Sequence, residues 1–288
     1  MEKRTIEELL TLYELEPAIK DVFVEGPIDR AFFETVLRYA RLGDVQVSEI
    51  EVIEIPEAVL GRITSSSGHR QSVIALAIEL ERASTQDLTR RVCCIADADH
   101  EAGGTPAIRG TLLLYTDFTA IELYAFSPSV VQRYFDQVVL GFPLTAEATL
   151  RAMEPVLREM ALSRRLNTHL GLATSPVDAT DDCEISGASL LFDSQRFTHR
   201  FLNKASATHR MGEYATAKTR LGTLLPGNPR LWVHAEDFIN LLYWMVLRLR
   251  GGGRTVSREL LGKTLLLAVP LEDIVLEPMF AELLRRLS

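Results

Sequence analysis

Short apolar runs alternate with helical patterns over the first third of the chain, and this alternation constrains the fold most. Residues 21–25 (DVFVE) form a β-rich apolar run that Gly26 and Pro27 end, and residues 28–39 then carry apolar side chains at helical spacing. Pro27 suits the first position of a helix, because a helix leaves the N–H group at that position unpaired. The sequence therefore predicts a strand–turn–helix unit.

The same alternation continues to about residue 116. Alternating apolar residues at 45–55 predict a second strand, and the spacing at 71–82 predicts a helix. The apolar runs at 92–95 (VCCI) and 112–116 (LLLYT) predict two more buried strands. Strands separated by helical stretches are typical of an α/β fold with parallel strand pairs.

Helical patterns predominate from about residue 127, most clearly at 146–162, 235–249 and 271–287, whereas segment 176–187 has no regular pattern. We therefore expect two domains. Residues 1–126 form the α/β domain, and residues 127–288 form a mainly helical domain that binds a partner or nucleic acid.

Composition excludes several classes of protein. The chain has 31 Lys and Arg against 39 Asp and Glu, a net charge of −8, which argues against a chain that is basic throughout for nucleic-acid binding. Its three cysteines show no CxxC spacing, so neither a disulfide scaffold nor a cysteine zinc site is expected. The charged N-terminus and the absence of a long apolar run predict a cytoplasmic protein that does not enter a membrane.

Acidic residues follow two of the predicted strands. Glu25 ends the first, and Asp97 and Asp99 follow the strand at 92–95. If these strands are parallel neighbours, the acids meet at the sheet edge where α/β proteins bind ligands. Extended backbone also places Asp97 and Asp99 on one side. Carboxylates held close together repel one another, and Mg²⁺ or Mn²⁺ removes that cost. Asp29 is either a further metal ligand or an ordinary acid at a helix start.

These residues resemble the TOPRIM domain, which topoisomerases, primases and OLD-type nucleases share. That family has a glutamate after its first strand and a DxD motif after a later one, which Glu25, Asp97 and Asp99 match. The VEGPID turn with Asp29 is most similar to the OLD-type branch. The resemblance covers about residues 20–125. It implies a TOPRIM-like parallel sheet, bound Mg²⁺ or Mn²⁺, and endonuclease activity with Glu25, Asp97 and Asp99 as catalytic residues.

A closer resemblance is to TOPRIM-like proteins encoded beside ABC-type ATPases in bacterial phage defence, including the effector nuclease of PARIS-type systems. Thr116 and Glu122 match the "T…IE" element of that group, and Glu122 is either a further metal ligand or an anchor of the helix start. His234 and Asp237 match its late His–Asp element except for one extra residue. This resemblance implies a toxic antiviral effector that is held or triggered by an ABC-type ATPase and acts on tRNA or DNA. A homo-oligomer is a further candidate assembly. The chain has no GxxxxGK[ST] loop of its own.

The segment 196–220 is the most basic part of the chain, with six Lys and Arg against one Glu. Its candidate nucleic-acid-binding residues are Arg196, Arg200, Lys204 and Arg210. The alternatives are a solvated helix face and an interface with a partner protein.

Other functions remain open. A DxD nucleotide-sugar transferase would hold Mn²⁺ on a diphosphate with Asp97 and Asp99, but gives no role to the turn at Glu25. A DxDxT phosphatase is disfavoured because Glu101 stands where threonine is required. A non-catalytic TOPRIM-like subunit that regulates an ATPase is the third alternative, and the presence of all three acids weighs against it.

Overall fold

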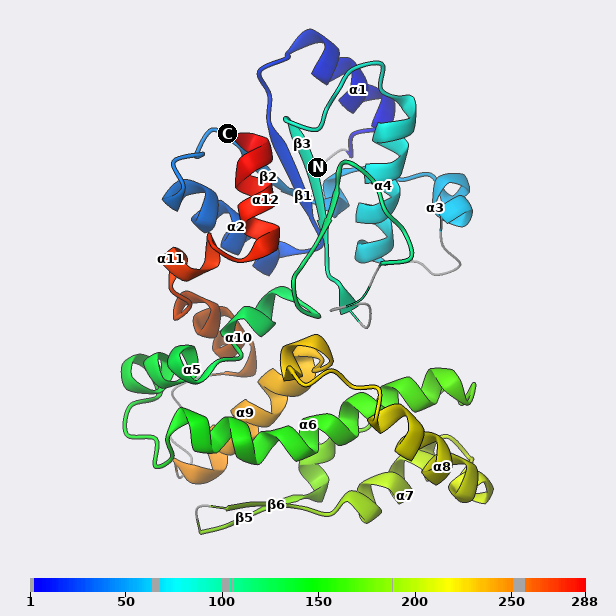
Figure 1. Cartoon of the computed structure of the whole chain (residues 1–288), viewed down its shortest axis with the longest axis vertical. Helices are drawn as coiled ribbons and strands as arrows, with labels where there is room; N and C mark the ends of the chain where they lie inside the picture. Colours follow the sequence, from blue (N-terminus) through cyan, green and yellow to red (C-terminus); the bar gives the residue numbers. More distant parts are fainter. Residues whose placement is uncertain (1–2, 64–67, 100–103, 105, 188, 251–256) are drawn as a thin grey trace. The chain divides into compact units, whose positions relative to one another are not determined.

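The computed structural model describes residues 3–63, 68–99, 104, 106–187, 189–250 and 257–288, and the chain divides into two compact units (Figure 1). The first unit combines Met1–Ile121 with Val269–Ser288, and the second is Glu122–Ala268. This division differs from the one expected at residue 126. The boundary falls slightly earlier, and the C-terminal segment belongs with the first unit.

A parallel sheet forms the centre of the first unit. Its strand order is β2-β1-β3-β4, with Asp21 opposite Gln46 and Phe23 opposite Cys94. The α/β class with a parallel sheet is therefore confirmed. The elements of this unit are α1 (Ile6–Leu15), β1 (Asp21–Val24), α2 (Pro27–Tyr39), β2 (Gln46–Glu49), α3 (Glu57–Ile63), α4 (His69–Ala83), β3 (Val92–Ala96), β4 (Leu113–Tyr115), α11 (Leu271–Ile274) and α12 (Pro278–Leu287).

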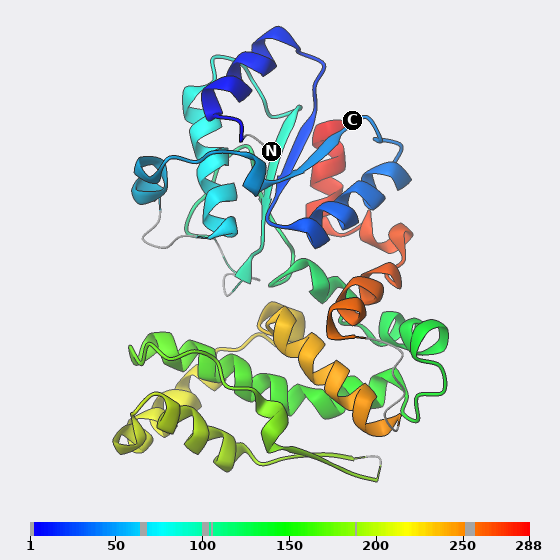
Figure 2. The same cartoon turned by 180° about the vertical axis from the view of Figure 1, so that it is seen from behind.

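Helices cover both faces of this sheet, α1 and α4 on one side and α2 and α12 on the other (Figures 1 and 2). On the first side, Leu9 and Tyr13 of α1 join Phe23 and Cys94 of the sheet in one buried apolar cluster. Both faces of β1 and β3 are therefore buried, which explains why β3 and residues 22–24 of β1 are apolar.

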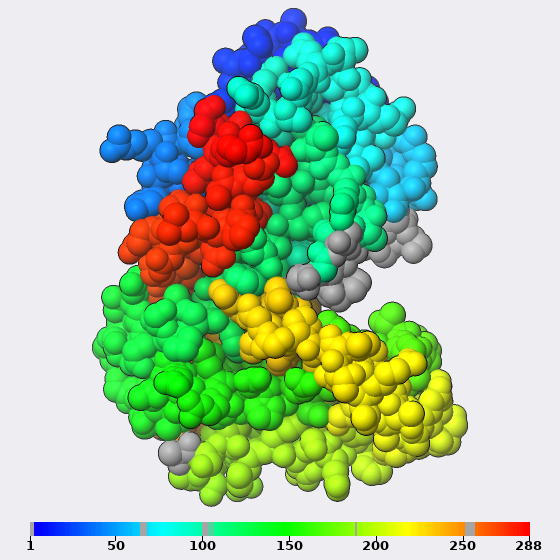
Figure 3. Space-filling view, viewed as in Figure 1, coloured from blue at the N-terminus to red at the C-terminus, as the bar shows by residue number. Residues whose placement is uncertain are grey.

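The C-terminal segment forms two helices rather than the single helix expected at 271–287. Pro278 starts α12, because proline cannot donate the hydrogen bond that would continue α11. Asp117 accepts the N–H group of Met279 at 3.1 Å and so caps the new helix. The segment, drawn in red and orange, lies on the surface of the first unit in Figure 3.

The second unit is mainly helical, as expected. The expectation that residues 176–187 are irregular is partly wrong, because residues 183–186 form one strand of an antiparallel hairpin. No helix in the described part of the chain is long and apolar enough to span a membrane. The elements of this unit are α5 (Pro128–Tyr134), α6 (Ala146–His169), β5 (Cys183–Ser186), β6 (Ser189–Phe192), α7 (Ser194–Lys204), α8 (Met211–Gly222), α9 (Ala235–Leu249) and α10 (Arg258–Leu267), and a 3₁₀ turn (Ile121–Ala125) spans its start.

Candidate functional site

The strand order of the sheet reverses direction between β1 and β3. In α/β sheets, ligands bind at the carboxyl ends of the two strands at such a point. From β1 the chain crosses through α2 to β2 on one side, and β3 is followed by β4 on the other. Glu25 follows β1 directly, and Asp97 follows β3. The backbone N–H group of Asp97 donates to Oε1 of Glu25 at 2.7 Å. Residues distant in the sequence therefore meet at this edge.

The Glu25 carboxylate lies in an environment that disfavours its charge. Burial and the negative charge of Asp99 raise the pKa of Glu25 to about 7, although the hydrogen bond from Asp97 N–H opposes that rise. A group in this position is able to exchange a proton or bind a cation near neutral pH. Sequence reasoning placed Glu25 at the edge but gave no indication of its burial.

The loop after β3 is held by backbone contacts with the segment after β4. The hydroxyl group of Thr116 accepts the N–H of Ala98 at 2.9 Å and donates to the carbonyl of Phe118 at 2.7 Å. Asp99 N–H donates to the carbonyl of Thr119 at 2.9 Å, and Asp99 has a φ of 48°. Because β3 ends at Ala96 and the backbone turns at Asp99, the two aspartates lie in the loop beyond the strand rather than within it.

Arg70, in the first turn of α4, is a residue of this site that the sequence did not reveal. Its Nε atom donates to the carbonyl oxygen of Asp97 at 2.7 Å and lies 3.3 Å from Oδ2 of Asp99. Its guanidinium carbon is 5.6 Å from the centre of the Tyr115 ring. A basic residue in a first turn opposes the helix dipole, which is the one local signal that could have drawn attention to it.

Asp29 and Glu122, the two other candidate metal ligands, lie in different parts of the chain. Oδ2 of Asp29 accepts the N–H of Gly26 at 2.9 Å, as an acid at the start of α2 does. Glu122 is the first residue of the second unit, where burial and the negative charge of Glu236 raise its pKa. Residues 100–103, which include Glu101, lie outside the described residues.

The side chains at the carboxyl edge suit a hard divalent cation in type. Glu25, Asp97 and Asp99 offer only oxygen donors, and the charges of Glu25 and Asp99 disfavour one another. Among the described residues, no group of three or more His, Cys, Asp and Glu side chains could hold a metal ion. Asp99 is instead paired with Arg70, and Glu25 accepts a backbone N–H group.

Two of the predicted nucleic-acid-binding arginines form ion pairs inside the second unit. Arg196 and Arg200 each lie 2.6 Å from a carboxylate oxygen of Asp182, whose side chain is fully buried. Arg200 also pairs with Asp181 at 2.6 Å. These acids precede the basic segment and lower its local positive charge.

The other two residues of the predicted patch are also engaged. Arg210 pairs with Glu213 at 2.7 Å, and Nζ of Lys204 donates to the carbonyl of Pro176 at 2.9 Å. Nucleic-acid binding by this segment therefore stays a prediction. These contacts give the segment a second role. The ion pairs of Arg196 and Arg200 join α7 to the residues before β5. Arg210 also donates to the carbonyl of Leu170 at the end of α6.

The late His–Asp element has a structural explanation. Asp237 is buried in the first turn of α9, and its two carboxylate oxygens accept Nε and Nη2 of Arg164 at 2.9 and 2.7 Å. This paired geometry joins α9 to α6 within the second unit.

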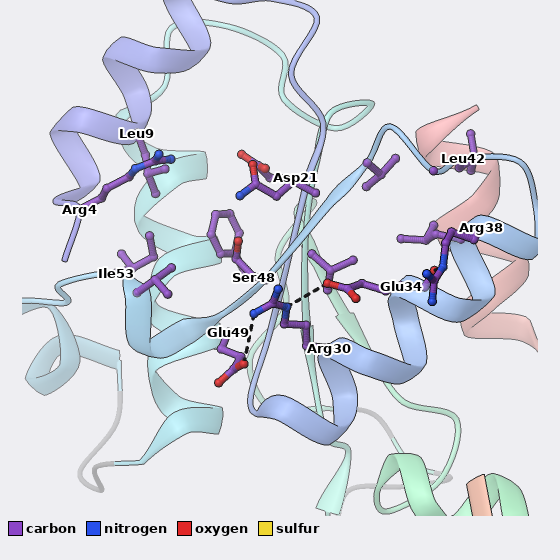
Figure 4. A pocket seen from close by; sticks show the side chains of 17 residues that line it. Arg4, Leu9, Asp21, Arg30, Glu34, Arg38, Leu42, Ser48, Glu49 and Ile53 are labelled. Carbon is purple, nitrogen blue, oxygen red and sulfur yellow. Dashed lines mark hydrogen bonds and ion pairs between the residues drawn. The ribbon is translucent and has the colours of Figure 1, made fainter. Parts of the chain in front are cut away.

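A cavity of about 670 Å³ lies along the open edge of the sheet, beside β2 (Figure 4). Arg30 crosses it, 2.9 Å from Glu34 and 3.6 Å from Glu49. Its lining does not include Glu25, Asp97 or Asp99. The cavity is therefore separate from the carboxyl edge.

No protein-family model and no curated protein matches the chain. The fold and the site define the chain as an α/β protein with a parallel sheet and an acidic carboxyl edge.

Proposed function

We propose that the chain is a metal-dependent endonuclease of TOPRIM-like type, with Mg²⁺ or Mn²⁺ held at the carboxyl edge by Glu25, Asp97 and Asp99. The observation that carries this proposal is the environment of Glu25. Its carboxylate is partly buried beside the DxD loop and accepts the Asp97 N–H group, and desolvation with the charge of Asp99 raises its pKa to about 7. A divalent cation would favour the anionic form of such a group.

Each residue has a part in this proposal. The metal would supply an activated water and stabilise charge on a phosphodiester. Glu25 and Asp99 supply carboxylate oxygens, and the Asp97 N–H group orients Glu25. Thr116 holds the DxD loop through Ala98, so that the donors keep their positions.

The wider role rests on the resemblance of the motifs to the ATPase-associated defence proteins. That resemblance supports a cytoplasmic effector with an ABC-type ATPase partner and tRNA or DNA as its substrate. The second unit is proposed as the part that binds the partner or the nucleic acid.

A cleavage panel tests the proposal. Purified protein is incubated with plasmid DNA, single-stranded DNA and total tRNA, with Mg²⁺, with Mn²⁺ or with EDTA. Glu25→Gln and the double variant Asp97→Asn/Asp99→Asn remove the proposed ligands. Glu147→Gln is the matched control, because its side chain is 69% exposed on α6 in the second unit.

We expect metal-dependent cleavage of one substrate that falls at least a hundredfold in Glu25→Gln and in the double variant. Glu147→Gln should cleave like the wild-type protein. Cleavage that survives loss of Glu25 would contradict the proposed site. Absence of cleavage with every substrate, even together with a co-purified ATPase, would favour the non-catalytic regulatory subunit.

A further inference from the structure

We infer that Arg70 is an internal counter-cation of the carboxyl edge, which competes with the divalent cation for Asp99 and so weakens metal binding. The inference rests on the proposed function, because it assumes that the cation binds at Glu25 and Asp99. It assigns to Arg70 a positioning role that acts through Asp99.

The contacts of Arg70 are unequal in a way that supports this role. The hydrogen bond to the Asp97 carbonyl is short, at 2.7 Å, whereas Asp99 lies 3.3 Å away. Charge-assisted pairs are normally 2.7–2.9 Å long, so the contact with Asp99 is the looser of the two. The ring of Tyr115 gives the guanidinium a further support. Arg70 can therefore release Asp99 and keep its place.

The exposure of the two partners points the same way. The Arg70 side chain is 14% exposed, and the Asp99 side chain is 45% exposed. The arginine is therefore held within the protein, while the carboxylate is accessible to an ion from solution. Asp99 itself has a positive φ and lies beyond the end of β3, so its side chain is not constrained by the sheet.

Electrostatics determine the direction of the effect. A guanidinium and a divalent cation beside one carboxylate repel each other, and the repulsion is appreciable where burial lowers the effective dielectric. Removing the positive charge should therefore tighten metal binding. If Arg70 only held the loop in shape, its removal would loosen the ligands and weaken binding, which is the opposite result.

The test is a titration of the full chain with Mn²⁺ alone, followed by the paramagnetic resonance signal of the free ion. Arg70→Gln removes the charge, and Arg70→Lys keeps it without the planar fork. Arg82→Gln is the matched control, because Arg82 lies in the last turn of the same helix and pairs with Glu79. The two positions are about 18 Å apart along α4 at the normal rise of a helix.

We expect Arg70→Gln to bind Mn²⁺ about tenfold more tightly than the wild-type chain, with Arg70→Lys and Arg82→Gln close to wild type. Unchanged or weaker binding by Arg70→Gln would overturn the inference and leave the proposed function standing. Wild-type binding that persists in Glu25→Gln and Asp99→Asn would overturn the proposed metal site itself. Absence of binding by every variant would overturn both.

Discussion

At the scale of single residues, β1 has an acid at each end, and Asp21 is buried whereas Glu25 is partly buried. Asp21, at its start, accepts the hydroxyl group of Tyr13 at 2.8 Å, and Glu25, after its end, accepts the N–H of Asp97. Burial is the largest effect on Asp21 and raises its pKa above the ordinary 3.8, against the lowering effects of Tyr13 and two arginines. Asp21 bonds to α1 and lines the cavity beside β2, whereas Glu25 lies at the carboxyl edge of the sheet.

Replacing Asp21 should change stability in a pH-dependent way. Because the pKa of Asp21 is raised in the folded state, its ionisation costs folding free energy, and this cost grows as pH rises from about 4 through the folded pKa. Asp21→Asn, which can still accept the Tyr13 hydroxyl, should unfold at higher urea than wild type at pH 7. The advantage should shrink towards pH 4.

The measurement is urea unfolding of both proteins between pH 4 and pH 8. Tyr13→Phe is the companion variant, because it removes the donor and keeps the acid. If the wild-type chain is more stable than Asp21→Asn at every pH, the prediction is wrong and the ionised Asp21 stabilises the fold.

At the scale of helices and strands, the sequence predicted the elements that have a regular apolar pattern. It did not predict the ion pairs and hydrogen bonds between residues far apart in the sequence. The strands β1 and β3 and helix α2 were predictable, because buried elements leave apolar runs and regular spacing. The pairing of Arg196 and Arg200 with Asp182 was not, because it joins residues 14 and 18 positions apart that share no pattern. The position of Arg70 was missed for the same reason.

The double variant Arg196→Gln/Arg200→Gln tests this pairing. It leaves the buried Asp182 carboxylate without both arginines, so the second unit should lose about 1–3 kcal/mol of unfolding free energy. Trp232 and Trp244 both lie in this unit, so urea unfolding followed by tryptophan fluorescence reports on it.

Lys204→Gln is the control for this unfolding measurement, because the ammonium of Lys204 donates to the backbone carbonyl of Pro176 and not to Asp182. It should leave unfolding within about 0.5 kcal/mol of wild type. If the double variant is as stable as Lys204→Gln, the ion pairs contribute little, and the arginines are better regarded as surface charges.

At the scale of the whole chain, the first unit is built from two separated segments. Phe280 of α12 is fully buried, with its ring stacked on that of Phe33 at 5.2 Å and in edge contact with that of Phe32 at 6.0 Å. Lys20, just before β1, donates to the carbonyl of Leu287. The segment 269–288 is thus part of the core of the first unit, which no local pattern in a helical C-terminal region could indicate.

Phe280→Ala should therefore destabilise the first unit selectively, by about 3–5 kcal/mol, the usual cost of removing a buried aromatic ring. Hydrogen–deuterium exchange should become faster in peptides from β1 and β3 and stay unchanged in peptides from α6 and α9. Leu276→Ala is the control, since that side chain is 77% exposed. Faster exchange confined to the second unit would contradict the division of the chain.

The position of α12 has a consequence for biosynthesis. The ribosome produces residues 122–268 before it produces the segment that covers the α2 face of the sheet. The second unit can therefore fold while the first still exposes Phe32 and Phe33. During that interval the nascent chain carries the acids of the carboxyl edge on an unfinished scaffold, so their assembly depends on the synthesis of residues 269–288.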